Sequence, residues 1–362
     1  MPPNALATAI RSQLLLASES QPVCRLRSTD PFGAHLDYFR IGNNPGVDAG
    51  FLSGFRVPGS RYRLTEIRWK WGFSGYTCES ETRVTPGERL VVPAIKVKYA
   101  DSLEDYVSFV EKSASAKHKQ LWFRGSGRTS HKLVPTLYRH KRYRVIDDIL
   151  LLEKELFSRF RQRSIPFHSR PLTDEWEWLF LMQHFGVPTR LLDWSESPLM
   201  ALFFAVTSAP HKIGKSGRPV FGGDACVWLL DPAQWNKHSV DLKSFPGTVL
   251  TTDDPNATAY KPVANITTMK PFPIALYGSH NSQRIVAQRG VFVCFGKDTR
   301  PMEAAYGSED FPADCLMKVV LRRGRLPHIY EAIRRQGITD SVVFPDLDGL
   351  AREIKREYAF EV

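Results

Sequence analysis

Residues 173–208 constrain the fold of this chain more than any other segment. Asp174 and Glu177 form a capping-box pattern, which predicts that a helix begins at this point. Gly186 is placed to end that helix, and Pro188 prevents the helix from resuming. The sequence therefore predicts a short helix whose two ends are both specified by local chemistry.

A strand and a second helix follow directly. Residues 189–193 have the pattern of a short strand. Ser197 and Pro198 then provide an N-cap and a first-turn proline for a helix at 199–207, which is apolar nearly all round. A helix without a polar face has to be buried, so we expect it to pack inside the domain.

The rest of the chain supplies helices and strands in an order typical of an α+β fold. A short strand ending at Gly125 and a helix from Ile146 to Phe160 are expected before this segment, and two C-terminal helices after it. The later expected strands are 225–230, 284–286, 291–295, 315–321 and 341–344. Residues 232–281 must contain further elements, because so long a loop is implausible. We predict a mixed or antiparallel central sheet with flanking helices.

The first 95 residues differ in texture from the remainder. They are rich in glycine and aromatic residues, and the stretches 62–71 and 89–93 alternate as antiparallel strands do. Beyond them, helical patterns alternate with short strands. We therefore predict a β-rich N-terminal unit at 1–95, which senses or binds a partner, and a main domain at 96–362.

Cysteine usage and hydropathy indicate the compartment. The five cysteines of this 362-residue chain are scattered and lack the spacing of a zinc site, which predicts neither a disulfide framework nor a metal. The sequence contains no apolar stretch long enough for a membrane span or a secretory signal. We expect a cytoplasmic protein with no membrane partner.

The net charge of +11 is concentrated in residues 119–170, which hold 13 basic and 4 acidic side chains. No acidic residue lies between Lys119 and Arg144, and aromatic residues are interleaved with the basic ones. Such a composition suits the phosphates and bases of nucleic acid. The alternative is a solvated basic face whose aromatic residues belong to the core.

Three polar clusters interrupt apolar segments and hold the candidate binding residues. In the first, Arg124 stands beside Gly125 at the end of a strand. A guanidinium in this position either pairs with a carboxylate or binds a phosphate, for which its planar fork is suited. Glycine here lets a ligand or another backbone approach closely.

The second cluster surrounds the strand at 189–193. Arg190 and Asp193 face opposite sides of that strand, so each needs a partner from elsewhere, and Arg124 is a charge-compatible partner for Asp193. The start of the following helix can bind an anion through hydroxyls and free N–H groups. The candidate binding residues of this cluster are His184, Thr189, Arg190, Ser195 and Ser197. The alternative is that these residues only cap and stabilise the fold.

The third cluster is polar but contains no acid. It consists of residues 281–284, which end in Arg284, and residues 288–292, which begin with Gln288, and no carboxylate occurs between Lys270 and Gly296. Amide side chains can bind the edge of a ligand but cannot act as general bases. None of the standard signatures of serine hydrolases, zinc proteases, P-loop enzymes or Rossmann proteins accompanies these clusters.

The chain resembles the FRG domain family over about residues 101–355. The motifs that carry the resemblance are Phe123–Gly125, Gln183–Ser195, Ser197–Ala205, Arg284–Phe292 and Phe344–Ala351. The resemblance implies a bacterial or phage protein that acts as an intracellular effector in phage defence or toxin-like conflict.

The order of these motifs is also similar to the arginine-serine-glutamate class of ADP-ribosyltransferases. This resemblance implies that Arg124 contacts the phosphates or ribose of NAD and that Ser195 or Ser197 braces the nicotinamide end. The glutamate of that class has no counterpart in this sequence, so Asp193 and Glu196 are the nearest candidates for a catalytic carboxylate.

Two hypotheses follow. In the first, the protein binds NAD or a related nucleotide and transfers ADP-ribose or cleaves NAD, with the three clusters converging on one pocket. In the second, it is a non-catalytic module that binds nucleic acid or protein through the basic segment 119–170.

Overall fold

The computed structural model divides the chain into two compact units, Met1–Val91 and Val92–Val362, which are described separately. In the first unit it describes the strands alone. From there on it describes residues 95–115, 120–167, 172–214, 219–239, 249–262, 267–279, 282–307, 311–358 and 360.

The N-terminal unit contains two antiparallel pairs of strands. β1 (Val23–Cys24) pairs with β2 (Phe39–Arg40), and β3 (Ala49–Arg56) pairs with β4 (Arg63–Lys70). The alternating stretch at 62–71 is thus confirmed as a strand. The stretch at 89–93 lies outside the described residues.

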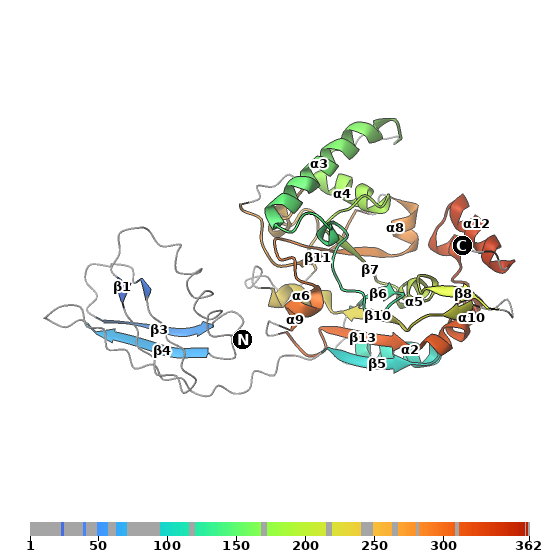
Figure 1. Ribbon diagram of the computed structural model, residues 1–362, viewed down its shortest axis with the longest axis horizontal. Coiled ribbons are helices and arrows are strands. Elements are labelled where there is room, and N and C mark those ends of the chain that lie inside the picture. Colours follow the sequence, from blue (N-terminus) through green and yellow to red (C-terminus); the bar gives the residue numbers. More distant parts are fainter. Residues whose placement is uncertain are drawn as a thin grey trace. The chain divides into compact units, whose positions relative to one another are not determined.

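The main unit is built on a seven-stranded sheet in the order β11-β12-β7-β6-β10-β13-β5 (Figure 1). Its strands are β5 (Lys96–Ala100), β6 (Trp122–Ser126), β7 (Leu191–Ser195), β10 (Ala225–Leu230), β11 (Ile274–Leu276), β12 (Gly290–Cys294) and β13 (Leu316–Leu321). Neighbouring strands are antiparallel except for β13 and β5, which are parallel. The expected mixed sheet with flanking helices is confirmed. A separate small hairpin joins β8 (His211–Ile213) to β9 (Pro219–Phe221).

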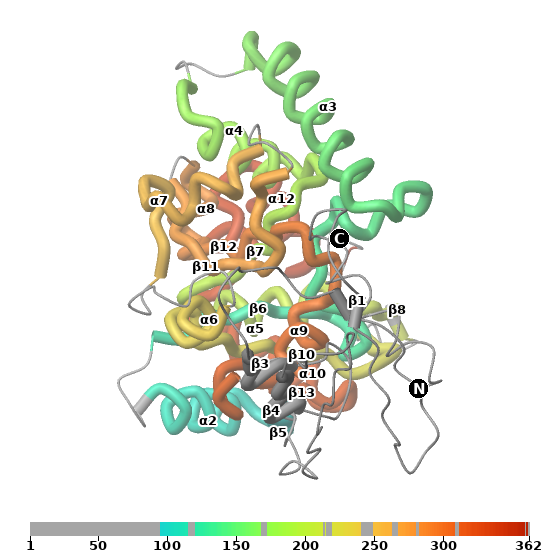
Figure 2. Tube along the Cα trace, turned by 90° about the vertical axis from the view of Figure 1, so that its left-hand side faces the viewer, coloured from blue at the N-terminus to red at the C-terminus, as the bar shows by residue number. Residues whose placement is uncertain are grey.

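The helices cover both faces of this sheet. They are α2 (Leu103–Ser115), α3 (Ile146–Ser164), α4 (Glu175–His184), α5 (Pro198–Thr207), α6 (Pro232–His238), α7 (Pro255–Thr258), α8 (Gln283–Ala287), α9 (Met302–Tyr306), α10 (Leu326–Arg335), α11 (Asp340–Val343) and α12 (Leu347–Glu357). Short 3-10 helices lie at Leu137–Arg139 (η1), Ile165–Phe167 (η2) and Arg323–Arg325 (η4). Figure 2 shows α3 extending away from the sheet.

Alternation along the strands separates the two hydrophobic faces. On one face, Phe123 of β6 packs in a core with residues of α2, α5 and α10. On the other, Trp122 packs with residues of α3, α6 and α9. A further cluster packs Trp176 of α4 and Ile285 of α8 against β7, β11 and β12. Ser195 pairs with Phe123 and lies four residues beyond Leu191, so these three side chains are on one face of the sheet. Leu191 packs with α4 and α8, and Phe123 packs with α5. These three helices therefore lie on the same sheet face.

The predicted caps position α4, β7 and α5. The Asp174 carboxylate accepts a hydrogen bond from the Trp176 N–H at the start of α4. Gly186 has φ +75°, the left-handed conformation in which helices commonly end. Ser197 caps α5 by accepting from the Met200 N–H, and Pro198 occupies the first turn.

Two expected strands are helices. Residues 284–286 belong to α8, because the Ser282 hydroxyl accepts from the Ile285 N–H and caps a helix, although Ile285 and Val286 are β-branched. Residues 341–344 include most of α11. The long stretch 232–281 contains α6, α7 and β11, and β5 adds an edge strand that the sequence pattern did not reveal.

Candidate functional site

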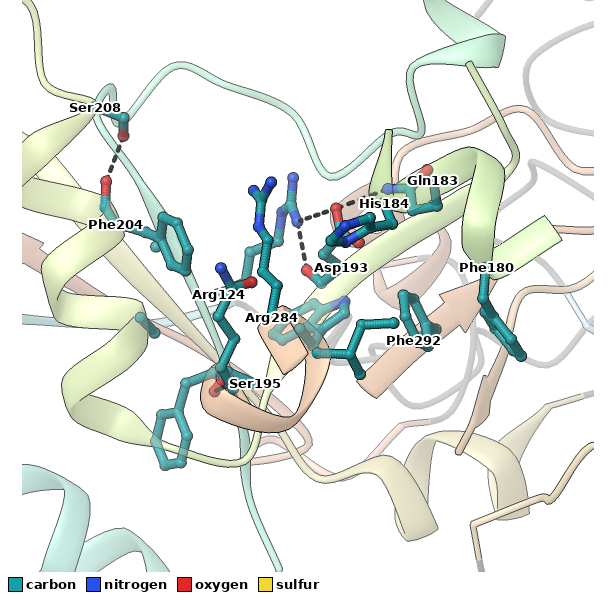
Figure 3. A pocket seen from close by; sticks show the side chains of 16 residues that line it. Arg124, Phe180, Gln183, His184, Asp193, Ser195, Phe204, Ser208, Arg284 and Phe292 are labelled. Carbon is teal, nitrogen blue, oxygen red and sulfur yellow. Dashed lines mark hydrogen bonds and ion pairs between the residues drawn. The ribbon is translucent and has the colours of Figure 1, made fainter. Parts of the chain in front are cut away.

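A pocket of about 310 Å³ lies between the helices on one face of the sheet (Figure 3). Its floor is formed where β6 and β7 meet, at the pair Phe123 and Ser195. Its walls come from α4, α5, α8 and β12, which contribute Phe180, Phe204, Arg284 and Phe292 among others. The three polar clusters, far apart in sequence, therefore meet in one cavity.

Arg124 and Asp193 face each other in this pocket. The Arg124 guanidinium donates to the main-chain oxygen of Asp193 and lies 4.0 Å from its carboxylate. Their side chains are 28% and 56% exposed, so both can reach a ligand. Burial lowers the pKa of Arg124, whereas the Asp193 charge raises it, and the guanidinium stays protonated. The predicted pairing of Arg124 with Asp193 is confirmed.

The orientation of Asp193 depends on a hydrogen-bonded chain. The Gln183 amide donates to the Asp193 carboxylate at 2.7 Å, and its oxygen accepts from the Thr189 hydroxyl. Thr189 is fully buried and does not line the pocket. Thr189 therefore acts on the site only through Gln183, a residue of the second cluster that is not among the predicted binding residues.

A second arginine enters the pocket from α8. Figure 3 shows the Arg284 side chain running beside that of Arg124 toward the same space. The guanidinium carbon of Arg284 lies 4.6 Å from the centre of the Phe344 ring, and Arg352 lies 4.4 Å from the same ring. Burial lowers the pKa of Arg284, and the nearby Asp193 charge raises it. Arg284 belongs to the third polar cluster and begins a family motif, but the predicted binding residues do not include it.

His184 and Gln288 complete the polar lining. Burial and the charge of Arg284 lower the pKa of His184, so the imidazole is neutral at pH 7. The Gln288 amide donates to the main-chain oxygen of Val343, and its own main-chain oxygen accepts from the Ser195 hydroxyl at 2.6 Å. These bonds tie the turn before β12 to the end of β7 and to α11.

Gly125 lines the pocket but chiefly serves packing. A Cβ at this position would come within 2.0 Å of the Ala201 main-chain oxygen and 2.5 Å of the Ala205 main-chain nitrogen. The absence of a side chain thus lets α5 lie directly on β6. The sequence indicated that either a ligand or another backbone approaches Gly125, and in the structure the backbone of α5 does so.

Three further candidates lie outside the pocket lining. Arg190 is fully buried and forms a 2.7 Å ion pair with Glu153, while its other nitrogens donate to the main-chain oxygens of Phe295 and Tyr260. Glu196 accepts from the Gln120 amide, and Ser197 caps α5. The expectation that Arg190 and Ser197 join Arg124 in one pocket is therefore not met.

The site combines two arginines, one carboxylate and aromatic walls, which is a suitable lining for an anionic ligand with planar rings. No group of three or more potential metal ligands occurs among the residues that the structure describes. Within the same residues, no helix has the length and apolar character needed to cross a membrane.

The fold and site define an α+β domain with a cationic pocket at the centre of its sheet. The FRG domain family matches residues 119–213, a stretch that includes β6, β7, α4 and α5. Residues 119–213 therefore match an FRG domain, as the motifs within that stretch predicted, while the motifs at 284–292 and 344–351 lie outside the match. Neither the curated proteins nor the solved structures include a match to this chain.

Proposed function

We propose that this pocket binds NAD or a related nucleotide, with the phosphates held by Arg124 and Arg284. The observation that carries the proposal is the convergence of two charged arginines and an exposed carboxylate, from three separate motifs, in one cavity. Two neighbouring guanidinium groups repel each other, and an anionic phosphate between them relieves that repulsion.

The aromatic walls suit the rings of the same ligand. Phe180 and Phe292 stack on each other with ring centres 4.7 Å apart, and Phe204 forms part of the opposite wall. A volume of about 310 Å³ is at the lower end for ligand pockets. It matches one nucleotide half of NAD, with the other half extending from the mouth.

Asp193 is the pocket carboxylate that can support chemistry. When the bond between nicotinamide and its ribose breaks, the electron pair leaves with nicotinamide and positive charge develops on the ribose. A fixed carboxylate stabilises that charge. A new bond then forms between the ribose carbon and an oxygen of water or of an acceptor, whose proton passes to solvent. We therefore assign to Asp193 the role of the catalytic carboxylate, which the third polar cluster lacks.

The cellular role follows from the family resemblance. We propose an intracellular effector of a bacterium or phage that acts in phage defence or toxin-like conflict by consuming NAD or attaching ADP-ribose to a target. The supporting observation is the FRG match to the pocket-forming segment.

The test is NAD binding by calorimetry and nicotinamide release by chromatography, with variants that separate the two steps. Arg124→Lys keeps the charge but not the planar fork, and should weaken binding roughly 10- to 150-fold. Asp193→Asn should retain binding and lose about 10²- to 10³-fold in nicotinamide release, as expected for loss of one electrostatic stabiliser.

The matched control is Arg322→Lys, because Arg322 is half-exposed and pairs with Asp101 away from the pocket. It should behave as wild type, and all variants should melt at the wild-type temperature. Absence of NAD binding at millimolar concentration would refute the proposal. Binding without nicotinamide release by the wild type would refute the catalytic part alone.

A further inference from the structure

We propose that the exposed segment Arg128–Arg144, here called the basic loop, binds single-stranded nucleic acid beside the pocket. This binding activity is separate from the proposed reaction with NAD. The proposal rests on the exposure of the basic side chains, on the absence of a carboxylate partner for five of them, on the attachment of the loop to the core, and on an aromatic pair in which the Tyr143 ring is exposed.

The basic side chains of the loop stand in solvent. All six are exposed, namely those of Arg128, Lys132, Arg139, Lys141, Arg142 and Arg144. Lys132 lies 3.7 Å from Glu303. Among the described residues, no carboxylate lies within ion-pair distance of the other five. Five unpaired cations on a short segment create a strong positive potential that favours a polyanion.

The loop is attached firmly next to the pocket. Leu133, Leu137 and Tyr138 anchor it in the core. The Leu137 N–H donates to the main-chain oxygen of Thr189 at 3.2 Å, and Thr189 contacts the pocket residue Gln183. In Figure 3 the chain that follows β6 passes above the guanidinium groups of the pocket. The cations are therefore displayed on a fixed backbone at the edge of the site.

Like charges are crowded where the loop meets the pocket. The His131 ring lies 3.1 Å from the Ser126 hydroxyl at the end of β6. Burial lowers the pKa of His131, and the charges of Arg128, Arg139 and Arg124 lower it further. The positive potential is thus continuous from the pocket onto the loop.

An aromatic pair with one exposed ring favours a nucleic acid over an acidic protein as the partner. Tyr143 is 39% exposed, and its ring lies 4.8 Å from that of His140 at an angle of 36°. The His140 ring nitrogen also accepts from the Arg142 and Tyr143 N–H groups, which fixes the turn. A braced aromatic ring between cations is a platform on which an unpaired base can stack. Bases in a duplex are already stacked, so we assign a single strand.

The experiment measures binding of a labelled mixed-sequence oligonucleotide by fluorescence anisotropy, as DNA and RNA single strands and as a duplex. The triple variant Lys141→Ala, Arg142→Ala, Arg144→Ala should bind at least about tenfold more weakly. For single strands, the slope of log K against log salt concentration should become about two units shallower. Tyr143→Ala should weaken single-strand binding roughly 5- to 150-fold and spare duplex binding, whereas Tyr143→Phe should bind normally.

The control removes the same charge elsewhere. Lys237→Ala, Arg335→Ala, Lys355→Ala also deletes three exposed cations, and it should retain wild-type affinity. Equal losses in the two triple variants would overturn the proposal, as would absence of binding by the wild type. Preferential binding of polyglutamate would overturn it in favour of an acidic protein. The loop variants should bind NAD as wild type does, and Arg124→Lys should retain oligonucleotide binding. These two controls show separately whether the nucleic-acid proposal or the NAD proposal fails.

Discussion

Breaking the buried ion pair between Arg190 and Glu153 is predicted to destabilise the main unit strongly. The side chains are 0% and 1% exposed and are joined by a 2.7 Å bond from Nε to Oε2. Burial alone would lower the pKa of Arg190, but the Glu153 carboxylate raises it above its usual value. Glu153→Gln keeps the shape of the side chain and removes its charge.

The loss of stability in Glu153→Gln follows from the contacts that Arg190 keeps after the substitution. Two main-chain oxygens, those of Phe295 and Tyr260, still accept from the guanidinium, but no carboxylate neutralises it. Leaving one member of a buried pair without its counter-charge costs about 3–5 kcal/mol. With a shift of about 2–4 °C for each kcal/mol in a domain of this size, the melting temperature should fall by roughly 6–20 °C.

The assay is urea unfolding followed by tryptophan fluorescence, together with thermal melting. Glu155→Gln is the matched control, because Glu155 is exposed on the same helix and its substitution should change the free energy of unfolding by less than about 0.5 kcal/mol. Replacing the pair by Glu153→Leu with Arg190→Met should recover most of the stability. If Glu153→Gln were no less stable than Glu155→Gln, the structural role given to Arg190 would be wrong.

Three further outcomes are expected. Gly125→Ala should destabilise the domain by about 3 kcal/mol or more in urea unfolding, because the new Cβ meets the Ala201 main-chain oxygen, and an unchanged midpoint would contradict this packing. Arg289→Gly should stabilise it by about 0.5–1 kcal/mol in the same assay, since Arg289 has φ +46°, and a midpoint below that of wild type would contradict this. His131 and His184 have lowered pKa values, so their contribution to stability is present above the unfolded pKa of about 6.5 and is lost as the pH falls through their folded values. A double His→Gln variant should therefore lose less stability than wild type between pH 7.5 and pH 5.5, and identical pH profiles would refute the assignment.

The sequence predicted best those elements whose ends are set by local chemistry. The ends of α4 and the start of α5 were predictable from Asp174, Gly186 and Ser197, because caps and positive-φ glycines act within a few residues. The strand expected at 284–286 is wrong because three residues are too few to show a period, and the Ser282 cap begins a helix there. The edge strand β5 depends on pairing with β13, which is distant in sequence.

The site was predictable in part for the same reason. Strand alternation separated Arg190 from Asp193 and suggested Arg124 as the partner of Asp193, which the structure confirms. The partner of Arg190, Glu153, lies on a helix 37 residues earlier, and no local pattern joins the two. Arg284 enters the pocket only because α8 packs beside α4 over the sheet.

The central claim is that the pocket between β6 and β7 holds an anionic nucleotide on two arginines. A crystal structure of the protein soaked with NAD tests it most directly. Phosphate oxygens should lie within hydrogen-bond distance, about 2.7–3.2 Å, of the Arg124 and Arg284 guanidinium groups. Nucleotide bound elsewhere on the domain, or a pocket that stays without nucleotide at millimolar NAD, would contradict it.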